Sequence, residues 1–248
     1  MTGNFYDKVA KKFGGYKTGS KHFSKFDSGD PEEVFRGRLI GLSSREKTAL
    51  DIGCADGRFT LSIARHFLKV FAIDESEGML KVAEKRRLDE GVSNVEFLKM
   101  DAGNMDFEDL YFDVVYNRRG PSFYSEYFRV LKEGGYYLEI GIGEKDAMDL
   151  KKVFGRGQNY GKWDQPPLEL DKLILKRAGF EVNYCRDFYY TEYYETSKEL
   201  DLFLRGVPIF EDYDSEKDLL NLNNFSRMFF SNKGIELGRH RIVIVARK

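Results

Sequence analysis

A glycine-rich turn between a short apolar run and an amphipathic segment limits the fold of this chain more than any other feature. The run Ala49-Leu50-Asp51-Ile52 leads into Gly53-Cys54-Ala55-Asp56-Gly57, and a helical pattern begins at Arg58. Glycine permits positive φ values and lets a ligand approach the main chain closely. We therefore predict a strand, a tight loop and a helix, with a ligand lying against the loop.

Two later acids follow neighbouring apolar runs. Residues 70–73 end in Asp74, and a carboxylate at that position can accept hydrogen bonds from both hydroxyls of a ribose. The alternative is that Asp74 caps the next helix, but Ser76 is placed to do so and leaves Asp74 free. Glu75 adjoins this acid, and Met79 lies one turn into the helix, where its side chain can pack on an adenine.

The third acid is Asp101, which follows the run Val95 to Met100. Its carboxylate can accept from an adenine amino group, and the small Ala102 leaves its backbone NH accessible. An ordinary loop acid is the alternative at this single position. Three acids that follow successive strands, however, favour a nucleoside site.

The charge and spacing of the glycine loop distinguish between nucleoside cofactors. Gly53-x-Ala55-x-Gly57 differs from the Gly-x-Gly-x-x-Gly of dinucleotide enzymes. Asp51 and Asp56 place negative charge where a pyrophosphate would lie, which disfavours a phosphate and favours an ammonium group. The cofactor should carry a cationic amine and no phosphate, as S-adenosylmethionine does. A purely structural turn is the alternative.

Apolar runs and amphipathic segments alternate from Lys47 onwards. Strands are predicted at residues 48–52, 69–74, 94–99, 112–116, 135–141, 181–190 and 241–246. Helices are predicted at residues 1–13, from Asp30-Pro31, at 57–67, 77–90, 122–131, 146–154 and 168–178, and near 196–205 and 215–230. This alternation favours an α/β fold, in which a parallel sheet has helices on both faces and binds its ligand at the carboxyl ends of the strands.

Composition excludes several classes of protein. The formal net charge of the 248 residues is −1, so no global basic field attracts nucleic acid. Cys54 and Cys185, the only two cysteines, cannot build a disulfide framework or a metal cluster, and we expect free thiols, no metal and a cytoplasmic location. No apolar run reaches the roughly 18 residues of a membrane span, and the polar N-terminus does not predict a signal peptide.

Residues 48–141 resemble the class I S-adenosylmethionine-dependent methyltransferases, in particular the ubiquinone/menaquinone-type C-methyltransferases. The resemblance covers the glycine loop, Asp74, Asp101-Ala102, Phe112-Asp113-Val114-Val115-Tyr116 and the turn Arg129-Val130-Leu131-Lys132-Glu133-Gly134-Gly135. Ala55 stands where glycine is more usual. The resemblance implies a Rossmann-like fold whose seven-stranded, mostly parallel sheet has an antiparallel last strand. It also implies that Phe5-Tyr6-Asp7-Lys8-Val9-Ala10 closes over the cofactor.

This fold implies three parts of the chain. Residues 1–46 form an N-terminal helical cap, residues 47–190 and 238–248 form the methyltransferase core, and residues 191–237 form an aromatic-rich helical insert. The aromatic rings of the insert either form a lid that lines a pocket for a flat or apolar acceptor, or are the core of a small subdomain. These two interpretations are compatible.

The residues that would contact the acceptor are less defined. In this fold the loop Asn117-Arg118-Arg119 borders the transferred methyl group, so Asn117 is assigned to the cofactor site. Arg118 and Arg119 could clamp an anionic acceptor, or could form surface ion pairs. These arginines and Tyr6 are the catalytic candidates. We expect Arg239-His240-Arg241, at the start of the last strand, to lie on the edge opposite or oblique to the cofactor.

Three functions remain open. The first is methyl transfer to a small-molecule acceptor, anionic or aromatic, and it is the leading hypothesis. The second is methylation of an rRNA or tRNA base, for which the mildly basic segment 151–163 offers charge and stacking. Residues 112–160, with Pro121, the turn Lys132-Glu133-Gly134-Gly135 and Asp149-Leu150-Lys151, also resemble the bacterial 23S rRNA guanine-N1 methyltransferases, but the cysteines of their zinc module are absent. The third is a catalytically silent module that binds S-adenosylmethionine.

Overall fold

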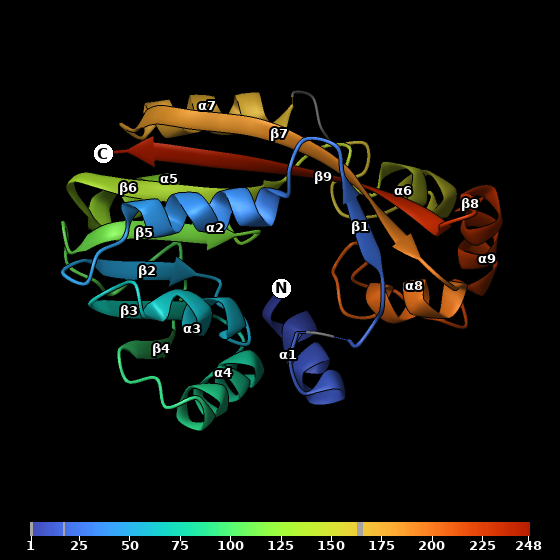
Figure 1. The fold of residues 1–248 in the computed structure, drawn as a ribbon, viewed down its shortest axis with the longest axis horizontal. Coiled ribbons are helices and arrows are strands. Elements are labelled where there is room, and N and C mark those ends of the chain that lie inside the picture. Colours follow the sequence, from blue (N-terminus) through green and yellow to red (C-terminus); the bar gives the residue numbers. More distant parts are fainter. Residues whose placement is uncertain (1, 17, 163–165) are drawn as a thin grey trace.

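The structure is a computed structural model that describes residues 2–16, 18–162 and 166–248 (Figure 1). The helices are α1 (Thr2–Phe13), α2 (Pro31–Leu42), α3 (Arg58–Ala64), α4 (Glu77–Asp89), α5 (Tyr124–Val130), α6 (Met148–Phe154), α7 (Pro167–Arg177), α8 (Ser197–Leu204) and α9 (Leu219–Met228). The strands are β1 (Phe23–Phe26), β2 (Thr48–Ile52), β3 (Lys69–Asp74), β4 (Val95–Lys99), β5 (Phe112–Arg118), β6 (Leu131–Ile142), β7 (Glu181–Tyr194), β8 (Phe230–Ser231) and β9 (Gly234–Arg247).

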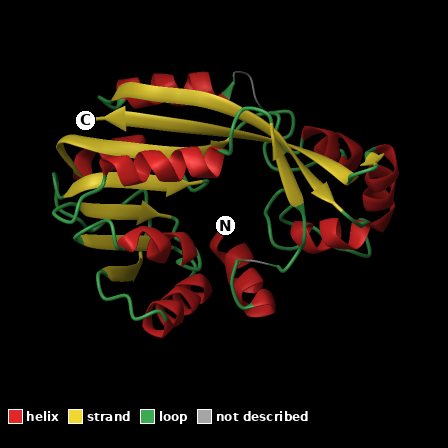
Figure 2. Ribbon diagram, viewed as in Figure 1, coloured by secondary structure: helices red, strands yellow, loops and turns green. Residues whose placement is uncertain are grey.

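The described strands form one sheet in the order β1-β7-β9-β6-β5-β2-β3-β4, with β8 paired to β9 (Figure 2). Strands β2 to β6 pair in parallel with one another. Strand β9 pairs antiparallel with β6 on one side and with β7 on the other. The structure thus confirms the α/β fold with a mostly parallel sheet and an antiparallel last strand.

The sheet has nine strands over the described residues, whereas the sequence predicted seven. Strand β1 lies between the helices predicted at residues 1–13 and from Asp30-Pro31, where we predicted no strand, and β8 lies at the end of a segment that we expected to be helical. The four residues of β1 pair antiparallel with β7, where the Phe23 ring stacks on Tyr193 with centroids 4.8 Å apart. Such short strands have almost no pattern of their own. The partner of β1 lies far away in the sequence, whereas β8 pairs with the adjacent start of β9.

Strands β7 and β9 are longer than predicted and form a ribbon that connects the core with the distal helices (Figure 1). Strand β7 continues from the predicted end at residue 190 to Tyr194, and β9 begins at Gly234 rather than at residue 241. Helices α8 and α9 lie between these strands, close to the predicted positions. The division of the chain into cap, core and lid stays a prediction.

Apolar side chains cover both faces of the sheet. Phe35 of α2 and Leu61 of α3 pack on one face with Val243 of β9. On the other face, Tyr127 of α5 and Leu175 of α7 pack with residues of β2, β5 and β6. A third cluster, in the distal part, contains residues of α6, α8 and α9 together with the ends of β7 and β9. The sheet therefore has helices on both faces, as predicted.

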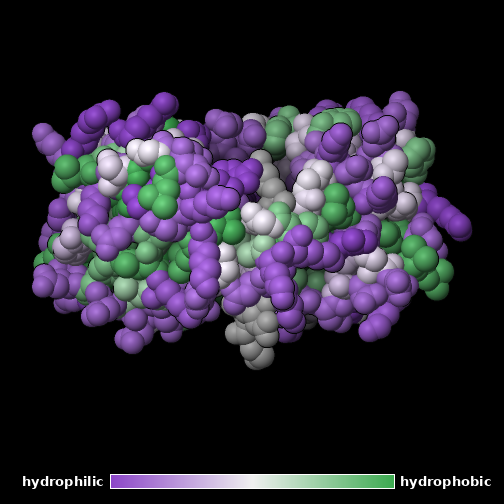
Figure 3. Space-filling model, turned by 90° about the horizontal axis from the view of Figure 1, so that it is seen from below, coloured by the Kyte–Doolittle hydropathy of each residue, from purple (hydrophilic) through white to green (hydrophobic). Residues whose placement is uncertain are grey.

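The N-terminal helix α1 packs against α4, where Val9 and Ala10 contact Met79. Figure 1 shows α1 beside α4, between the core and the distal helices. None of the described helices combines the length and the apolar character needed to span a bilayer. In the view of Figure 3, hydrophilic side chains cover most of the face, with smaller hydrophobic areas that include the end formed by the distal helices.

Candidate functional site

The loop between β2 and α3 has the backbone geometry that its glycines suggest. Gly53 and Gly57 both have φ of +70°, and Ala55 has φ of +46°. A Cβ atom on Gly57 would lie 2.6 Å from the Phe97 ring and 2.8 Å from the Ala83 Cβ, so only glycine fits there. Alanine pays a steric penalty at positive φ, which accounts for glycine being more usual at position 55.

Asp74, at the end of β3, holds this loop in place. Its Oδ2 atom accepts a hydrogen bond from the Ala55 backbone NH at 2.8 Å, and Oδ1 accepts from the Ser76 NH at 2.8 Å. The Ser76 hydroxyl oxygen accepts from the Met79 NH at 3.1 Å and caps α4, as the sequence predicted. Burial raises the pKa of Asp74, although the two NH donors oppose this effect.

Asp51 and Asp56 have different environments. Asp51 is buried at the end of β2, where its Oδ2 atom accepts from the Thr60 hydroxyl at 2.6 Å, and burial raises its pKa to about 6. Asp56 forms ion pairs with Arg86 at 3.3 Å and Arg58 at 3.4 Å. The negative charge of Asp56 is therefore compensated within the protein, and our argument from Asp56 against a phosphate was wrong.

Two residues that we assigned to the cofactor have buried side chains. Cys54 packs with Ala72 and Leu80, and burial raises the pKa of its thiol well above the ordinary value. Met79 is completely buried beneath α1, beside Val9. In this structure Met79 packs on α1, which differs from the predicted contact with an adenine.

Asp101 follows β4 and is exposed, and its Oδ1 atom accepts from the Gly103 NH at 2.8 Å. Ala102 beside it is buried, and Glu75, after β3, is exposed. Because β2, β3 and β4 are parallel neighbours, Asp51, Asp74 and Asp101 lie at one edge of the sheet. The sequence predicted this alignment.

The amide of Asn117 closes the turn after β5. Its Nδ2 atom donates to the Pro121 carbonyl at 2.6 Å, and its Oδ1 atom accepts from the Gly120 NH at 2.7 Å. Gly120 lies against the glycine loop, since a Cβ atom on Gly53 would be 3.7 Å from the Gly120 Cα. The buried Asn117 side chain therefore shapes the loop that faces Gly53.

Arg118 and Arg119 both pair with one carboxylate from another part of the chain. Arg118 Nη2 donates to Glu32 Oε2 at 2.7 Å, and Arg119 Nη1 pairs with the other oxygen of Glu32, in the first turn of α2. Burial opposes ionisation of Glu32, but Arg119 and Arg118 outweigh it and lower its pKa to about 2. The sequence analysis missed Glu32, because nothing in the local pattern of α2 points to these arginines.

Tyr6, the third catalytic candidate, lies near the same loop. Its ring centroid is 6.0 Å from that of Tyr16. Burial raises the pKa of Tyr6 and Tyr16 raises it further, whereas Arg119 lowers it. Tyr6 thus stays a neutral phenol, which can donate or accept a hydrogen bond.

The start of β9 lies on the same edge as the predicted cofactor site, and our placement of it on the opposite or oblique edge was wrong. Because β9 is antiparallel to β6, Arg241 lies opposite Ile142, the last residue of β6. His240 points to the other face and is fully buried, with Nδ1 accepting from the Lys145 NH at 3.2 Å. Its Nε2 atom therefore carries the proton and donates to Asp187 at 2.8 Å, so both ring nitrogens are already bonded.

The sequence analysis also missed a group of buried charges. Asp146, Lys151 and Glu192 accompany Arg239 and Arg241 near the junction of the core and the distal helices. A signal for this group was present in β9, where two arginines interrupt an apolar alternation. Glu139 was missed as well; it is buried in β6 and accepts from the hydroxyls of Tyr124 and Tyr137, both at 2.9 Å.

The residues at the carboxyl edge suit S-adenosylmethionine. Neither Asp51 nor Asp74 forms an ion pair within the described part of the chain, so both carboxylates keep the capacity to bind an ammonium group or a ribose diol. The loop between them exposes backbone rather than bulky side chains, because Gly53 and Ala55 are small.

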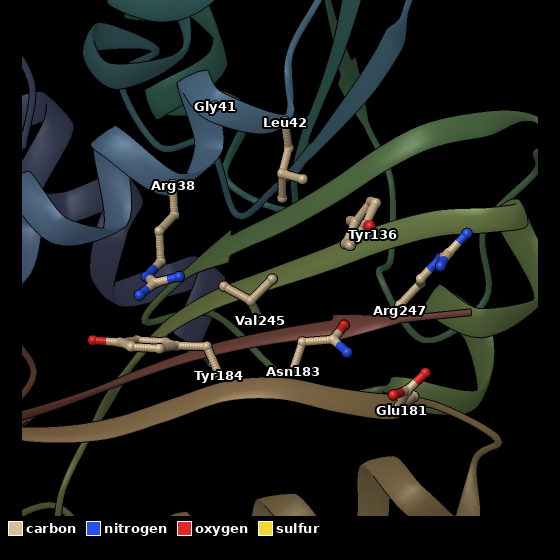
Figure 4. Close-up of a pocket in the computed structure, with 9 residues that line it drawn as sticks. All are labelled: Arg38, Gly41, Leu42, Tyr136, Glu181, Asn183, Tyr184, Val245 and Arg247. Atoms are coloured by element: carbon tan, nitrogen blue, oxygen red, sulfur yellow. The ribbon is translucent and has the colours of Figure 1, made fainter.

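A groove of about 450 Å³ lies at the opposite edge of the sheet (Figure 4). Arg38 of α2 lies over the Tyr184 ring at 3.3 Å from its centroid, and Tyr136 of β6 and Arg247, at the end of β9, also line the groove. Tyr136 pairs with Val114 near the start of β5, and Arg247 lies opposite both Tyr136 and Glu181, so the groove is level with the amino ends of the parallel strands. The groove is therefore remote from the acids that we assign to the cofactor.

Known proteins are similar to this chain over the same region. Residues 49–135 match a family model described as a methyltransferase domain. A demethylmenaquinone methyltransferase of Lactococcus lactis is 38% identical over 175 residues, which cover 58% of this chain and 68% of that protein. A ubiquinone/menaquinone biosynthesis C-methyltransferase, UbiE, of Azotobacter vinelandii is 33% identical over 51% of this chain and 55% of its own length.

A crystal structure of a Bacillus halodurans protein has a TM-score of 0.65 to this chain at 22% identity, and it covers 88% of this chain and 99% of the other. This likeness supports the fold alone. The family model, the relatives and the acids at neighbouring strand ends together identify the cofactor as S-adenosyl-L-methionine. The chain belongs to the class I S-adenosylmethionine-dependent methyltransferases, in the group of the ubiquinone/menaquinone-type enzymes.

Proposed function

We propose that this enzyme transfers the methyl group of S-adenosylmethionine to a small-molecule acceptor at the carboxyl edge of the sheet. The observation that carries the proposal is the hydrogen bond from the Ala55 NH to Asp74, which fixes the glycine loop against the second acidic strand end. Asp51 and the loop then lie beside Asp74, as an amino-acid and nucleoside cofactor requires.

The cofactor site in this proposal has three groups of residues. The loop residues Gly53, Cys54, Ala55 and Gly57 present backbone to the ligand, and Asp51 faces the ammonium group. Asp74 and Glu75 bind the ribose, Asp101 and Ala102 bind the adenine, and Asn117 shapes the turn beside the methyl group. Met79 supports this site from below, through its packing with α1.

The bound cofactor supplies a sulfonium that is already activated for displacement. The chain must chiefly align the acceptor with this group and exclude water. Tyr6, Arg118 and Arg119 come from two different segments near that position, and Glu32 holds the two arginines in place. A strong base is needed only where the acceptor holds its proton tightly.

The nature of the acceptor follows from the relatives and from the distal part of the chain. Both named relatives are named for quinones, which are flat and largely apolar. The distal part of the chain contains many aromatic rings, among them Phe154 of α6 and Phe210 of the loop after α8, which stack with centroids 4.4 Å apart within the apolar core of that part. We infer an apolar or aromatic acceptor that has a polar substituent.

Few basic side chains of the segment 151–163, on which the RNA alternative depends, are free to bind a phosphate. Within the segment 151–163, Lys151 is buried and Lys152 pairs with Asp149 at 3.0 Å. Arg156 pairs with Asp218 at 3.0 Å, and Trp163 lies outside the described residues. These pairs leave little free charge for a phosphate backbone.

An assay of turnover tests the proposal. The protein is incubated with S-adenosylmethionine and a panel of hydroquinones, and S-adenosylhomocysteine and methylated products are measured by mass spectrometry. We expect stoichiometric formation of both with at least one hydroquinone. If the protein binds the cofactor but methylates only RNA, the RNA alternative is correct. If it binds the cofactor and methylates nothing, the silent module is favoured.

A further inference from the structure

One face of the β7–β9 ribbon changes from apolar to polar and back along its length. In β9 the apolar residues of this face are Ile235, Leu237, Val243 and Val245. Alternate residues of a strand share a face, so Arg239 and Arg241 interrupt the apolar series between the distal cluster and the core cluster. The interruption lies where the ribbon meets the core, and Figure 1 shows β9 extending between the distal helices and the core there.

Five charged side chains form a polar belt at this position. They are Asp146, Lys151, Glu192, Arg239 and Arg241, and each is at most 7% exposed. Burial of charge is costly unless every charge has a partner. The ion pairs and hydrogen bonds within the polar belt therefore show whether each of its buried charges has a partner.

The pairing leaves one arginine short of partners. Arg239 donates to Asp146 at 2.8 Å and to Glu192 at 2.6 Å, so it has two carboxylates. Arg241 donates through Nη1 to the same Asp146 oxygen at 2.5 Å, and its buried Nε atom has no hydrogen-bond partner among the described residues. Burial opposes ionisation of Asp146, but the two arginines outweigh it and keep its pKa below the ordinary value.

Lys151 adds a further cation to the polar belt. It forms no ion pair within 4.0 Å in the described part of the chain, and burial lowers its pKa, as Arg239 and Arg241 also do, whereas Asp146 raises it. Three cations therefore share two carboxylates. An anion would complete the polar belt, because it would supply an acceptor for Arg241 Nε and a counter-charge for Lys151.

The polar belt lies close to the site of methyl transfer. Arg241 is opposite Ile142 at the end of β6, and Arg118 of β5 is opposite Ile140. The Cα of Arg241 is thus about 10 Å across two strand spacings and about 7 Å along the strands from that of Arg118. A small acceptor can span this distance between the loop after β5 and the polar belt.

We propose that the polar belt binds an oxyanion of the methyl acceptor, a carboxylate or a phosphate, with Arg241 as its principal donor and Lys151 as a second cation. This inference rests on the proposed function and identifies the polar substituent of the acceptor. Arg118 and Arg119, which the sequence suggested as anchors, share the carboxylate of Glu32, which compensates their charge. Arg118 Nε, like Arg241 Nε, has no hydrogen-bond partner among the described residues.

Calorimetric titration with simple aromatic anions tests this proposal. The whole protein, saturated with S-adenosylhomocysteine, is titrated with benzoate and, separately, with phenyl phosphate, which distinguishes the two oxyanions. We expect one of them to bind saturably. Arg241→Gln and Lys151→Met should each weaken it at least about tenfold, the loss expected for one charge-assisted hydrogen bond. Arg241→Lys should recover part of the affinity.

Arg247→Gln is the matched control, because Arg247 lies on the same strand but at the opposite edge of the sheet. This variant should bind the anion as the unmodified protein does. The proposal is overturned if neither anion binds saturably, or if folded Arg241→Gln and Lys151→Met proteins bind it with unchanged affinity. The anion titrations are repeated without S-adenosylhomocysteine. The cofactor assignment is tested separately, by the binding isotherm of S-adenosylhomocysteine itself, so a failure of one proposal can be distinguished from a failure of the other.

Discussion

The carboxylate of Asp7 accepts a hydrogen bond from the Ser76 hydroxyl at 2.6 Å, and this contact joins the N-terminal helix to the first turn of α4. The same Oδ1 atom accepts from the Gly78 NH at 2.9 Å, one of the NH groups that a helix leaves unpaired at its start. Ser76 also directs its NH to Asp74. Asp7 therefore positions α1 beside the acid that we assign to the ribose.

Replacement of Asp7 by alanine should loosen α1. The variant loses a cap for α4 and a tertiary contact, which we expect to lower the free energy of unfolding by about 1 kcal/mol, as loss of a helix cap does. Urea denaturation followed by circular dichroism measures the change. Asp27→Ala is the control and should have almost no effect, because Asp27 is an exposed acid whose ion pair with Lys25, at 3.6 Å, is exposed as well. Equal stability of the two variants would show that α1 is held by its apolar contacts alone.

Asp74→Ala should weaken the binding of S-adenosylhomocysteine by about 1–3 kcal/mol, because a buried ribose loses a charged acceptor. The loop also loses the bond from the Ala55 NH. Titration calorimetry measures the affinity, and Glu77→Gln, at an exposed acid in the first turn of α4, should bind as the unmodified protein does. An unchanged affinity in Asp74→Ala would contradict the ribose assignment.

The sequence was sufficient to predict the parts of the site that depend on local pattern. The glycine turn, the Ser76 cap and the acids at the ends of β2, β3 and β4 all follow from residues that are close together in the chain. Short-range rules of capping and strand alternation determine such features.

The rest of the site depends on contacts between distant segments. Glu32 pairs with Arg118 across 86 positions, and Asp56 pairs with Arg86 across a helix and a strand. A carboxylate that is compensated in this way cannot be distinguished in sequence from one that is free to bind a ligand. The error about β9 has the same origin, since only its pairing with β6 shows which edge Arg241 occupies.

The affinity for S-adenosylhomocysteine should depend on pH through Asp51. Burial raises the pKa of Asp51 to about 6, so the carboxylate becomes fully ionised only above that value. The ionised form attracts the ligand's ammonium group, which stays protonated, and the affinity should rise between about pH 5 and about pH 7. Calorimetry across this range measures the rise. Asp51→Asn should bind more weakly at pH 8 and without this slope; the same slope in the variant would exclude Asp51 as its cause.

Glu139 should make the folded state less stable as pH rises. Burial and, to a smaller extent, the nearby Asp171 of α7 raise its pKa from 4.5 to about 7, although the hydrogen bonds from Tyr137 and Tyr124 oppose this rise. The folded state therefore holds this proton more tightly than the unfolded chain, and the resulting stabilisation is complete below pH 4.5 and lost as pH rises towards 7. Glu139→Gln keeps an acceptor for both tyrosine hydroxyls and removes the titration.

Urea denaturation at several pH values tests this prediction. The free energy of unfolding of Glu139→Gln, minus that of the unmodified protein, should be about 1–3 kcal/mol larger at pH 8 than at pH 5. Glu133→Gln, at an exposed position of the same strand, should show no such difference. If the stability difference between Glu139→Gln and the unmodified protein does not vary with pH, the Glu139 carboxyl titrates normally in the folded state.

Gly143→Ala should destabilise the junction between the core and the distal helices. A Cβ atom there would lie 2.1 Å from Nδ1 of His240, which is fully buried and bonded through both ring nitrogens. His240 cannot move without breaking its bonds to the Lys145 NH and Asp187, so we expect a loss of at least about 2 kcal/mol in urea denaturation. Gly41→Ala is the matched control: its Cβ meets nothing within 4 Å, and in helix α2 it should gain about 0.5–1 kcal/mol. If Gly143→Ala is as stable as the unmodified protein, the His240 ring can adopt another position, and its two hydrogen bonds do not fix the start of β9.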